Sequence, residues 1–177
     1  MSFYQKLTQV GLRFISKDKL FKYGFNLTPM YRRSTGRVIQ VSKDLMNVRI
    51  KIRLNYKNRN YVNSIFGGSM FSAVDPIPMV QLMNIIGDDY VVWDKSAEVY
   101  FKRPAREHLY ADFSISSEEL DTIKERVVQE NEIEFPKKTL LTNKSGTVVY
   151  CEVIKKLYIA NKAFYKEKRK RQSQLVA

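Results

Sequence analysis

One short stretch of the chain combines the residue types that chemistry on a carbonyl group needs. Gly67 and Gly68 open a long apolar stretch, Asn60 precedes them, and Asp75 lies eight residues beyond Gly67. A helix that begins at paired glycines offers a developing oxyanion free backbone N–H groups and a positive dipole end. Asp75 would act as a general base toward water or as a nucleophile, and Asn60 would hold the water or the carbonyl.

Each of these residues also has a structural interpretation. The glycines would permit tight packing at a helix start, and Asp75, which precedes Pro76, would cap the second half of a broken helix. An acid inside an apolar helix is costly unless it is used or paired, which favours a functional Asp75. Gly67 and Asp75 would lie about 12 Å apart along an ideal helix, so Asp75 cannot serve the oxyanion hole of its own chain.

The rest of the chain predicts the elements that position these residues. From Leu45 to Leu54 apolar and polar residues alternate with period two, as they do from His108 to Ile115, and both patterns are typical of half-buried strands. Further strands are expected at 37–42, 90–103, 137–142 and 147–158. The apolar stretch that Gly67 opens predicts a buried helix with a kink or break near Pro76 and Pro78.

Helical spacing of apolar residues from Phe3 to Ile15 predicts an extra N-terminal helix, followed by an aromatic-rich connection from Phe21 to Tyr31. Residues 117–130 are charged and helix-permissive, and we expect them to form an exposed excursion. The fold class is therefore α+β: a curved antiparallel sheet of about six strands wrapped around one central helix. We divide the chain into a helical and basic extension (1–36), a domain (37–161) and a basic tail (162–177).

The stretch Asn-Tyr-Val-Asn-Ser-Ile-Phe-Gly-Gly-Ser-Met-Phe-Ser-Ala-Val-Asp, residues 60–75, resembles the hotdog superfamily, and within it the phenylacetic-acid-degradation type of acyl-CoA thioesterase. Residues 90–104 strengthen the resemblance, which is to an uncharacterised thioesterase-like branch and covers roughly residues 38–159. Asn60, Gly67, Gly68 and Asp75 match the family motif. Phe66 departs from it, because a histidine stands at that position in the family.

The resemblance implies hydrolysis of an acyl thioester by a homodimer or a dimer of dimers, with Asp75 facing the helix start of the partner subunit. Asp94 would line the site, hydrogen-bonding the water or pairing with Lys95 or an arginine, and Phe66 would pack there. Three basic residues would hold the phosphates of CoA, and the acyl chain would enter an apolar channel beside the central helix. These basic residues are Lys102, Arg103 and Arg106. The alternative is a non-catalytic hotdog protein that binds acyl groups or acts as a scaffold.

Composition sets further bounds. The single cysteine, Cys151, excludes an internal disulfide, fits a reducing, cytoplasmic location and is expected in the core. No metal-ligand spacing is present, and we expect no cofactor.

The net charge of +13 is concentrated before residue 60, where the sequence holds fourteen Lys and Arg but only two acids. It predicts attraction to polyanions, which leaves nucleic acid or a membrane surface as a third interpretation. Residues 61–87 resemble a membrane span in composition, but Asp75 and the prolines after it argue against one.

Overall fold

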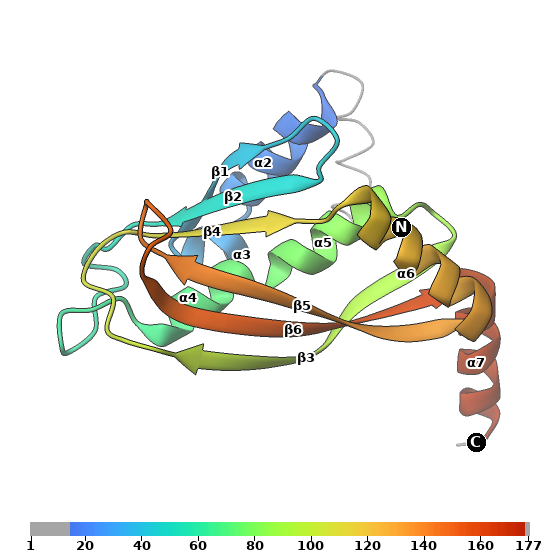
Figure 1. The fold of residues 1–177 in the computed structure, drawn as a ribbon. Coiled ribbons are helices and arrows are strands. Elements are labelled where there is room, and N and C mark those ends of the chain that lie inside the picture. The colour runs from blue at the N-terminus through green and yellow to red at the C-terminus, as the bar shows by residue number, and fades with distance from the viewer. Residues whose placement is uncertain (1–14, 176–177) are drawn as a thin grey trace.

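The computed structural model describes residues 15–175, and the helix expected from Phe3 to Ile15 lies outside this range apart from its last residue. Six antiparallel strands form one curved sheet in the order β1-β2-β4-β5-β6-β3 (Figure 1). The strands are β1 (Gly36–Val41), β2 (Asn47–Ile52), β3 (Tyr90–Phe101), β4 (Leu109–Ser114), β5 (Glu132–Thr142) and β6 (Val149–Asn161). The expected α+β architecture, a sheet around a central helix, is therefore confirmed.

The apolar residues of the two alternating strands face the core, as the sequence predicts. On β2, Val48, Ile50 and Ile52 are each at most 2% exposed, and on β4 Leu109 and Ala111 are equally enclosed. These two strands pair directly, Ile50 opposite Ala111. Because residues opposite each other in an antiparallel pair share a face, both strands turn their apolar side chains to the same core.

The central helix consists of α4 (Gly67–Val74) and α5 (Pro76–Ile85), which the sheet encloses (Figure 1). Asp75 joins them with helical backbone angles, φ −45° and ψ −53°, and its side chain makes no cap hydrogen bond. Pro76 stands at the first position of α5, where its missing N–H costs least. The predicted break at the prolines is confirmed, and the capping interpretation of Asp75 is wrong.

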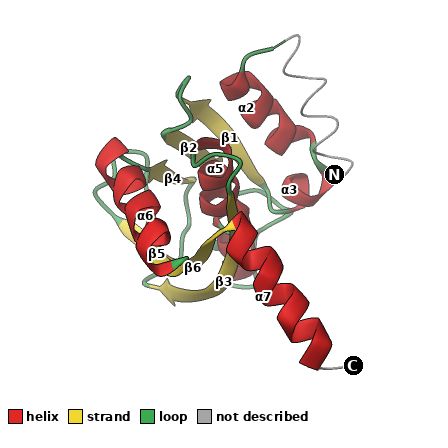
Figure 2. Ribbon diagram, turned by 90° about the vertical axis from the view of Figure 1, so that its right-hand side faces the viewer, coloured by secondary structure: helices red, strands yellow, loops and turns green. Residues whose placement is uncertain are grey.

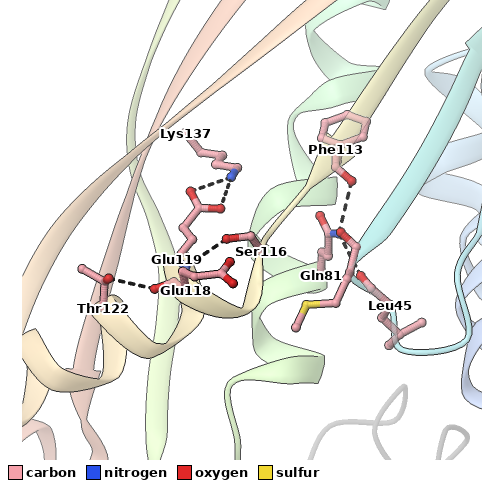
Figure 3. Close-up of polar contacts among 9 residues, drawn as sticks. Leu45, Gln81, Phe113, Ser116, Glu118, Glu119, Thr122 and Lys137 are labelled. Atoms are coloured by element: carbon pink, nitrogen blue, oxygen red, sulfur yellow. Dashed lines mark hydrogen bonds and ion pairs between the residues drawn. The ribbon is translucent and has the colours of Figure 1, made fainter.

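A buried amide fixes the second half of the central helix under the sheet. Gln81 of α5 is 1% exposed. Its Nε2 donates to the carbonyl oxygens of Leu45, at 2.8 Å, and Phe113, at 3.4 Å (Figure 3). A buried polar group is stable only when it is hydrogen-bonded, so this contact ties α5 to the hairpin before β2 and to β4.

The segment before the sheet is helical, and the expected aromatic connection over 21–31 is wrong. It forms α2 (Lys17–Leu27) and α3 (Pro29–Arg33), with α2 lying against β1. Phe21 and Phe25, four residues apart, share the buried face of α2, and their rings lie 4.8 Å apart. Tyr31 is 1% exposed and donates its hydroxyl to the Ala73 carbonyl of α4 at 3.1 Å. These aromatic rings make the N-terminal segment part of the core.

Residues 117–130 form α6 (Ser117–Glu130), and this helix covers the sheet rather than standing out in solvent. Ser116 caps its start by accepting from the Glu119 N–H at 3.1 Å, and the Glu119 carboxylate pairs with Lys137 of β5 at 2.6 Å (Figure 3). The predicted exposed excursion is wrong because every third or fourth residue is apolar and buried: Leu120, Ile123 and Val127.

The basic C-terminal segment is also helical. α7 (Lys162–Leu175) continues from β6 and projects from the sheet (Figure 2). Tyr165 meets the Trp93 ring edge-on at 4.8 Å, and Trp93 stacks on Tyr158 at 4.8 Å. Lys168 pairs with Glu132 at 2.6 Å.

Within residues 15–175, no helix is both long and apolar enough to cross a membrane.

Candidate functional site

Two carboxylates share one buried lysine where the central helix is kinked. Lys155 of β6 is 2% exposed. Its ammonium contacts the Asp75 carboxylate, and it lies 3.0 Å from Oδ1 of Asp94 on β3. The Asp75 side chain is 41% exposed, so this carboxylate keeps access to solvent while its charge is offset from inside. A lysine this enclosed is stable only beside opposite charge, which makes the three residues one unit.

Asp94 is the more unusual of the two acids. Its Oδ1 is buried and, apart from the charge contact with Lys155, has no hydrogen-bond partner among residues 15–175. Burial raises the pKa of Asp94; Lys155 opposes this rise, and the Asp75 charge adds to it. The Lys155 ammonium at 3.0 Å is therefore the polar partner of this buried oxygen.

Asp94 lies on the inward face of β3, two residues after the buried Val92, and a bulge follows it. Asp94 pairs with Leu157 of β6, but Ser96 pairs with the adjacent Lys156, so Lys95 is an extra residue between them. The bulge exchanges the two faces of β3, and bulges often re-aim side chains next to functional sites. Lys95 points elsewhere and pairs with Glu134. The expected partner of Asp94, Lys95 or an arginine, is therefore wrong.

Lys155 is the residue that the sequence analysis missed. On β6 it shares its face with Val153 and Leu157, which are at most 1% exposed. Side chains two residues apart lie on the same face of a strand, so a lysine between these two must point into the core. The sequence therefore contained a signal for Lys155, namely a charged residue at an inward position of a strand. This signal does not identify Asp75 and Asp94 as its partners.

Aromatic rings cover the start of α4. A Cβ on Gly67 would lie 2.7 Å from the ring of Phe101, and a Cβ on Gly68 would lie 2.9 Å from Cζ of Phe66. A larger residue at either position would have to displace one of these rings. Phe66 and Phe101 are both 57% exposed. The glycines therefore have a packing role, and the first N–H groups of α4 lie beneath two rings that face solvent.

Asn60 organises the loop before the helix. Its Oδ1 accepts from the N–H groups of Val62, at 3.1 Å, and Ser64, at 3.0 Å, and its Nδ2 donates to the Ser64 hydroxyl at 2.9 Å. The second N–H of its amide has no partner among residues 15–175. Asn60 and the helix start are thus neighbours, whereas Asp75 lies at the far end of α4.

The three basic residues expected at the site lie in the loop after β3, which passes beside the segment leading into α4. The Ala105 carbonyl of this loop accepts from the Ile65 N–H at 2.8 Å. Lys102 pairs with Glu152 at 3.7 Å, whereas Arg103 and Arg106 are exposed and make no ion pair with the described residues. The structure thus places these cations near the glycines, although the buried lysine-carboxylate unit lies one helix length away.

The apolar channel expected beside the central helix does not occur at the cavity found there. This cavity lies between α5, α6 and the sheet and is lined by residues that include Leu82, Ile123 and Leu157. Its volume is about 10 Å³, the room that one water molecule needs. An acyl chain does not fit in it.

Comparison with solved structures defines the fold as hotdog-like. A protein of unknown function from Pseudomonas aeruginosa, described as a "probable thioesterase", is 18% identical with a TM-score of 0.71; the match covers 81% of this chain and 95% of that one. A protein of unknown function from Chlorobaculum tepidum is 16% identical with a TM-score of 0.62, over 81% and 93%. A mutant thioesterase from Pseudomonas aeruginosa is 8% identical with a TM-score of 0.58, over 84% and 97%. At these identities the likeness shows the fold alone.

A family model also matches the chain. The model described as a domain of unknown function, DUF4442, covers residues 17–159, and the chain belongs to this family. No curated protein matches the sequence. The family match includes α2 and α3 and ends within β6.

Proposed function

We propose that the protein hydrolyses acyl thioesters, with Asp75 as the general base or the nucleophile. One observation carries this proposal: a solvent-accessible carboxylate in the central helix is held by a buried ammonium that also contacts Asp94. A lysine this deep in the core orients Asp75 without closing it off from solvent. The likeness in fold to thioesterases adds support, and so does the matching motif of the phenylacetic-acid-degradation type.

Thioester hydrolysis at this site needs a base or nucleophile, a water molecule and groups that stabilise the negative carbonyl oxygen. As a base, Asp75 takes a proton from water, the oxygen attacks the thioester carbonyl, and the C–S bond breaks as the thiol leaves with that proton. As a nucleophile, Asp75 forms an acyl anhydride, releases the thiol and is regenerated by water. In either route the carbonyl oxygen becomes negative, and N–H groups at a helix start would stabilise it.

The site needs a second subunit. Asp75 lies at the opposite end of α4 from Gly67 and Gly68, so one chain does not bring its own base to its own helix start. β3 is a free edge of the sheet, and Ser96, Ala97 and Glu98 on it are exposed. An unpaired edge is a template for pairing with another chain. We propose that a homodimer, alone or as a dimer of dimers, brings the base of one subunit to the helix start of the other.

A second candidate function is acyl or acyl-CoA binding without catalysis. A specific observation favours it: Phe66 replaces the family histidine, and its ring lies with that of Phe101 over the glycines. Neither phenyl ring can donate a hydrogen bond to a carbonyl or move a proton. Under this alternative the rings would contact an apolar acyl group, and the lysine-carboxylate unit would be structural.

The substitution Asp75→Asn separates the two functions. The amide keeps the size of the side chain but is neither a base nor a nucleophile, so thioester cleavage should fall at least about 100-fold, while binding of the acyl-CoA remains. Thiol release from a panel of short to long acyl-CoA substrates measures cleavage, and calorimetry measures binding.

The matched control is Asp112→Asn, which removes an exposed acid that pairs with Arg49 on the outer face of the sheet. It should cleave like the wild type. If the wild type cleaves no thioester in the panel but binds acyl-CoA, the catalytic proposal is wrong and the binding function stands. Label found in Asp75 after a single turnover in H₂¹⁸O then identifies the nucleophilic route with water attacking the Asp75 carbonyl carbon, because a general base exchanges no oxygen with water.

A further inference from the structure

A groove with four cations lies at the end of the molecule where α4 begins. It has a volume of about 490 Å³ and runs between the segment joining α3 to β1 and the loop after β2. Its charged lining residues are Arg32, Arg37, Arg53 and Lys57. None of the four pairs with a carboxylate of residues 15–175, although eleven ion pairs occur elsewhere in that part of the chain.

Like charges do not gather in one groove without cost. Four cations that face a common space repel one another, and an anion between them removes that repulsion. No acid lines the groove, whose other lining residues are Thr35, Asn55 and Tyr56. Tyr56 is 85% exposed, so a flat aromatic face is available at the rim. Cations with a hydroxyl and an amide beside them match the oxygen atoms of a phosphate group.

One buried amide holds both walls of the groove together. Asn58 is 2% exposed. Its Nδ2 donates to the Thr35 hydroxyl on one wall and to the Arg53 carbonyl on the other, each at 2.8 Å. Its Oδ1 accepts from the Asn55 N–H at 2.9 Å. The groove is therefore a built feature, because its shape is fixed by a satisfied polar group in the interior.

Backbone strain marks the same place. Thr35 has φ +62°, a conformation that is rare for a β-branched residue. Residues held in such conformations cluster at binding sites and persist only where the surroundings fix them. Here the Asn58 amide fixes the Thr35 hydroxyl. The strained residue thus turns the chain so that Arg32 and Arg37, on either side of it, line one groove.

We infer that this groove binds a phosphate-bearing ligand through its four cations, two of which, Arg53 and Lys57, come from the loop after β2. The groove connects to the proposed active site, because the Asn58 carbonyl accepts from the Phe66 N–H at the start of α4 at 2.7 Å. Identifying the phosphate as that of the CoA nucleotide rests on the proposed function. Phosphate binding itself does not.

Calorimetry on the full chain tests this, with adenosine 3′,5′-bisphosphate and inorganic pyrophosphate as probes. The double variant Arg53→Gln, Lys57→Gln should bind both probes at least about tenfold more weakly, because it loses two charge-assisted contacts. Its binding should also depend less on salt than that of the wild type. The control variant Lys43→Gln, Lys124→Gln removes the same charge at two lysines without ion pairs among the described residues and should bind like the wild type.

The alternatives give distinct results. Pyrophosphate binding that depends on Arg53 and Lys57 establishes a phosphate site, and tighter bisphosphate binding identifies a nucleotide. The assignment to this groove would be overturned if the control variant lost as much probe binding as the Arg53→Gln, Lys57→Gln variant. It would also be overturned if only the double variant Arg103→Gln, Arg106→Gln lost probe binding. If the protein binds an RNA oligonucleotide but neither the bisphosphate nor pyrophosphate, the groove is a nucleic-acid surface and the inferred phosphate site is wrong.

The same measurements separate this inference from catalysis. Asp75→Asn should bind the bisphosphate like the wild type, because it leaves the groove intact. If the bisphosphate binds and no thioester is cleaved, the proposed function fails and the groove stands. If thioesters are cleaved while the Arg53→Gln, Lys57→Gln variant binds normally, the groove fails and the proposed function stands.

Discussion

At the scale of single residues, Lys155 is central to the chemistry we propose. Burying an ammonium is costly, and here two carboxylates offset that cost. Since Asp75 is 41% exposed and Asp94 26%, the unit is only partly removed from water. This arrangement makes Lys155 a positioning residue for the carboxylates, and its removal should have a signature in pH dependence.

Replacing Lys155 with Met should destabilise the protein at pH 7 by about 1–3 kcal/mol, less than the loss of a fully buried pair because the carboxylates reach water. Without Lys155 the raised pKa of Asp94 should rise further. A carboxyl whose pKa is raised in the folded state lowers the free energy of unfolding as the pH rises through that pKa. The loss of stability in the variant, relative to the wild type, should therefore be smaller near pH 4 than at pH 7. Urea unfolding at both pH values measures this.

The control is Lys156→Met, which removes the neighbouring, half-exposed lysine that pairs with Glu134 at 3.2 Å. This exposed pair should contribute at most about 1 kcal/mol. A deficit that is the same in both variants, or the same at both pH values, would show that Lys155 does not act through the carboxylates.

At the scale of elements, α7 depends on contacts with the sheet. The helix is rich in Lys and Arg, and an isolated helix of this length is marginal in water. Its docking contacts are the Tyr165 ring on Trp93 and Lys168 on Glu132. Contacts with Lys168 and then Tyr158 hold the pKa of Glu132 below its usual range. The stability from this carboxylate is therefore present at neutral pH and lost as the pH falls through the folded-state pKa.

We expect Tyr165→Ala to release α7. Trp93 is the only tryptophan, so its emission reports on this contact and should shift to longer wavelength, with a smaller far-UV helix signal. Acidification should shift the wild-type emission in the same direction. The control Tyr61→Ala alters a fully exposed tyrosine and should change neither signal. An unchanged emission spectrum in Tyr165→Ala would mean that the helix stays docked without this ring.

At the scale of the whole molecule, the homodimer that we propose would form along β3, an edge strand of the sheet within residues 15–175. The other edge strand, β1, lies against α2, whereas the middle of β3 is exposed. We expect Ser96→Lys, on the outer face of β3 opposite Lys156, to shift the protein from dimer toward monomer in analytical ultracentrifugation, because a charge on an edge strand opposes pairing.

Gln40→Lys adds the same charge to β1 and should leave the mass of the assembly unchanged. A wild-type protein that is monomeric at all concentrations would contradict the shared site, and so would a Ser96→Lys variant that stays dimeric. The division into an extension (1–36), a domain (37–161) and a tail (162–177) stays a prediction. Isolated pieces of the chain would test it.

The sequence by itself determined the local features of this protein. Alternation predicted the inward face of β2 and β4, the glycine pair and the apolar run predicted the central helix, and the prolines predicted its break at Asp75. Each of these depends on neighbouring residues, whose periodicity follows directly from strand and helix geometry. The helices in the segment 17–33 were missed, and the helix-permissive segment 117–130 was wrongly expected to be exposed, because aromatic residues and charges hid apolar faces that appear only once the sheet they cover is known.

Only the tertiary structure decided which residues far apart in the sequence contact one another. Lys155 and Asp75 lie 80 residues apart, and the contacts of Lys155 with Asp75 and Asp94 depend on how β6 lies beneath α4 and beside β3. The cationic groove likewise joins two segments that lie side by side where β1 pairs with β2, Gly36 opposite Ile52, and that Asn58 bridges. Such pairings follow from strand order and register, which local patterns do not encode, because each segment satisfies its own periodicity whichever neighbour it meets.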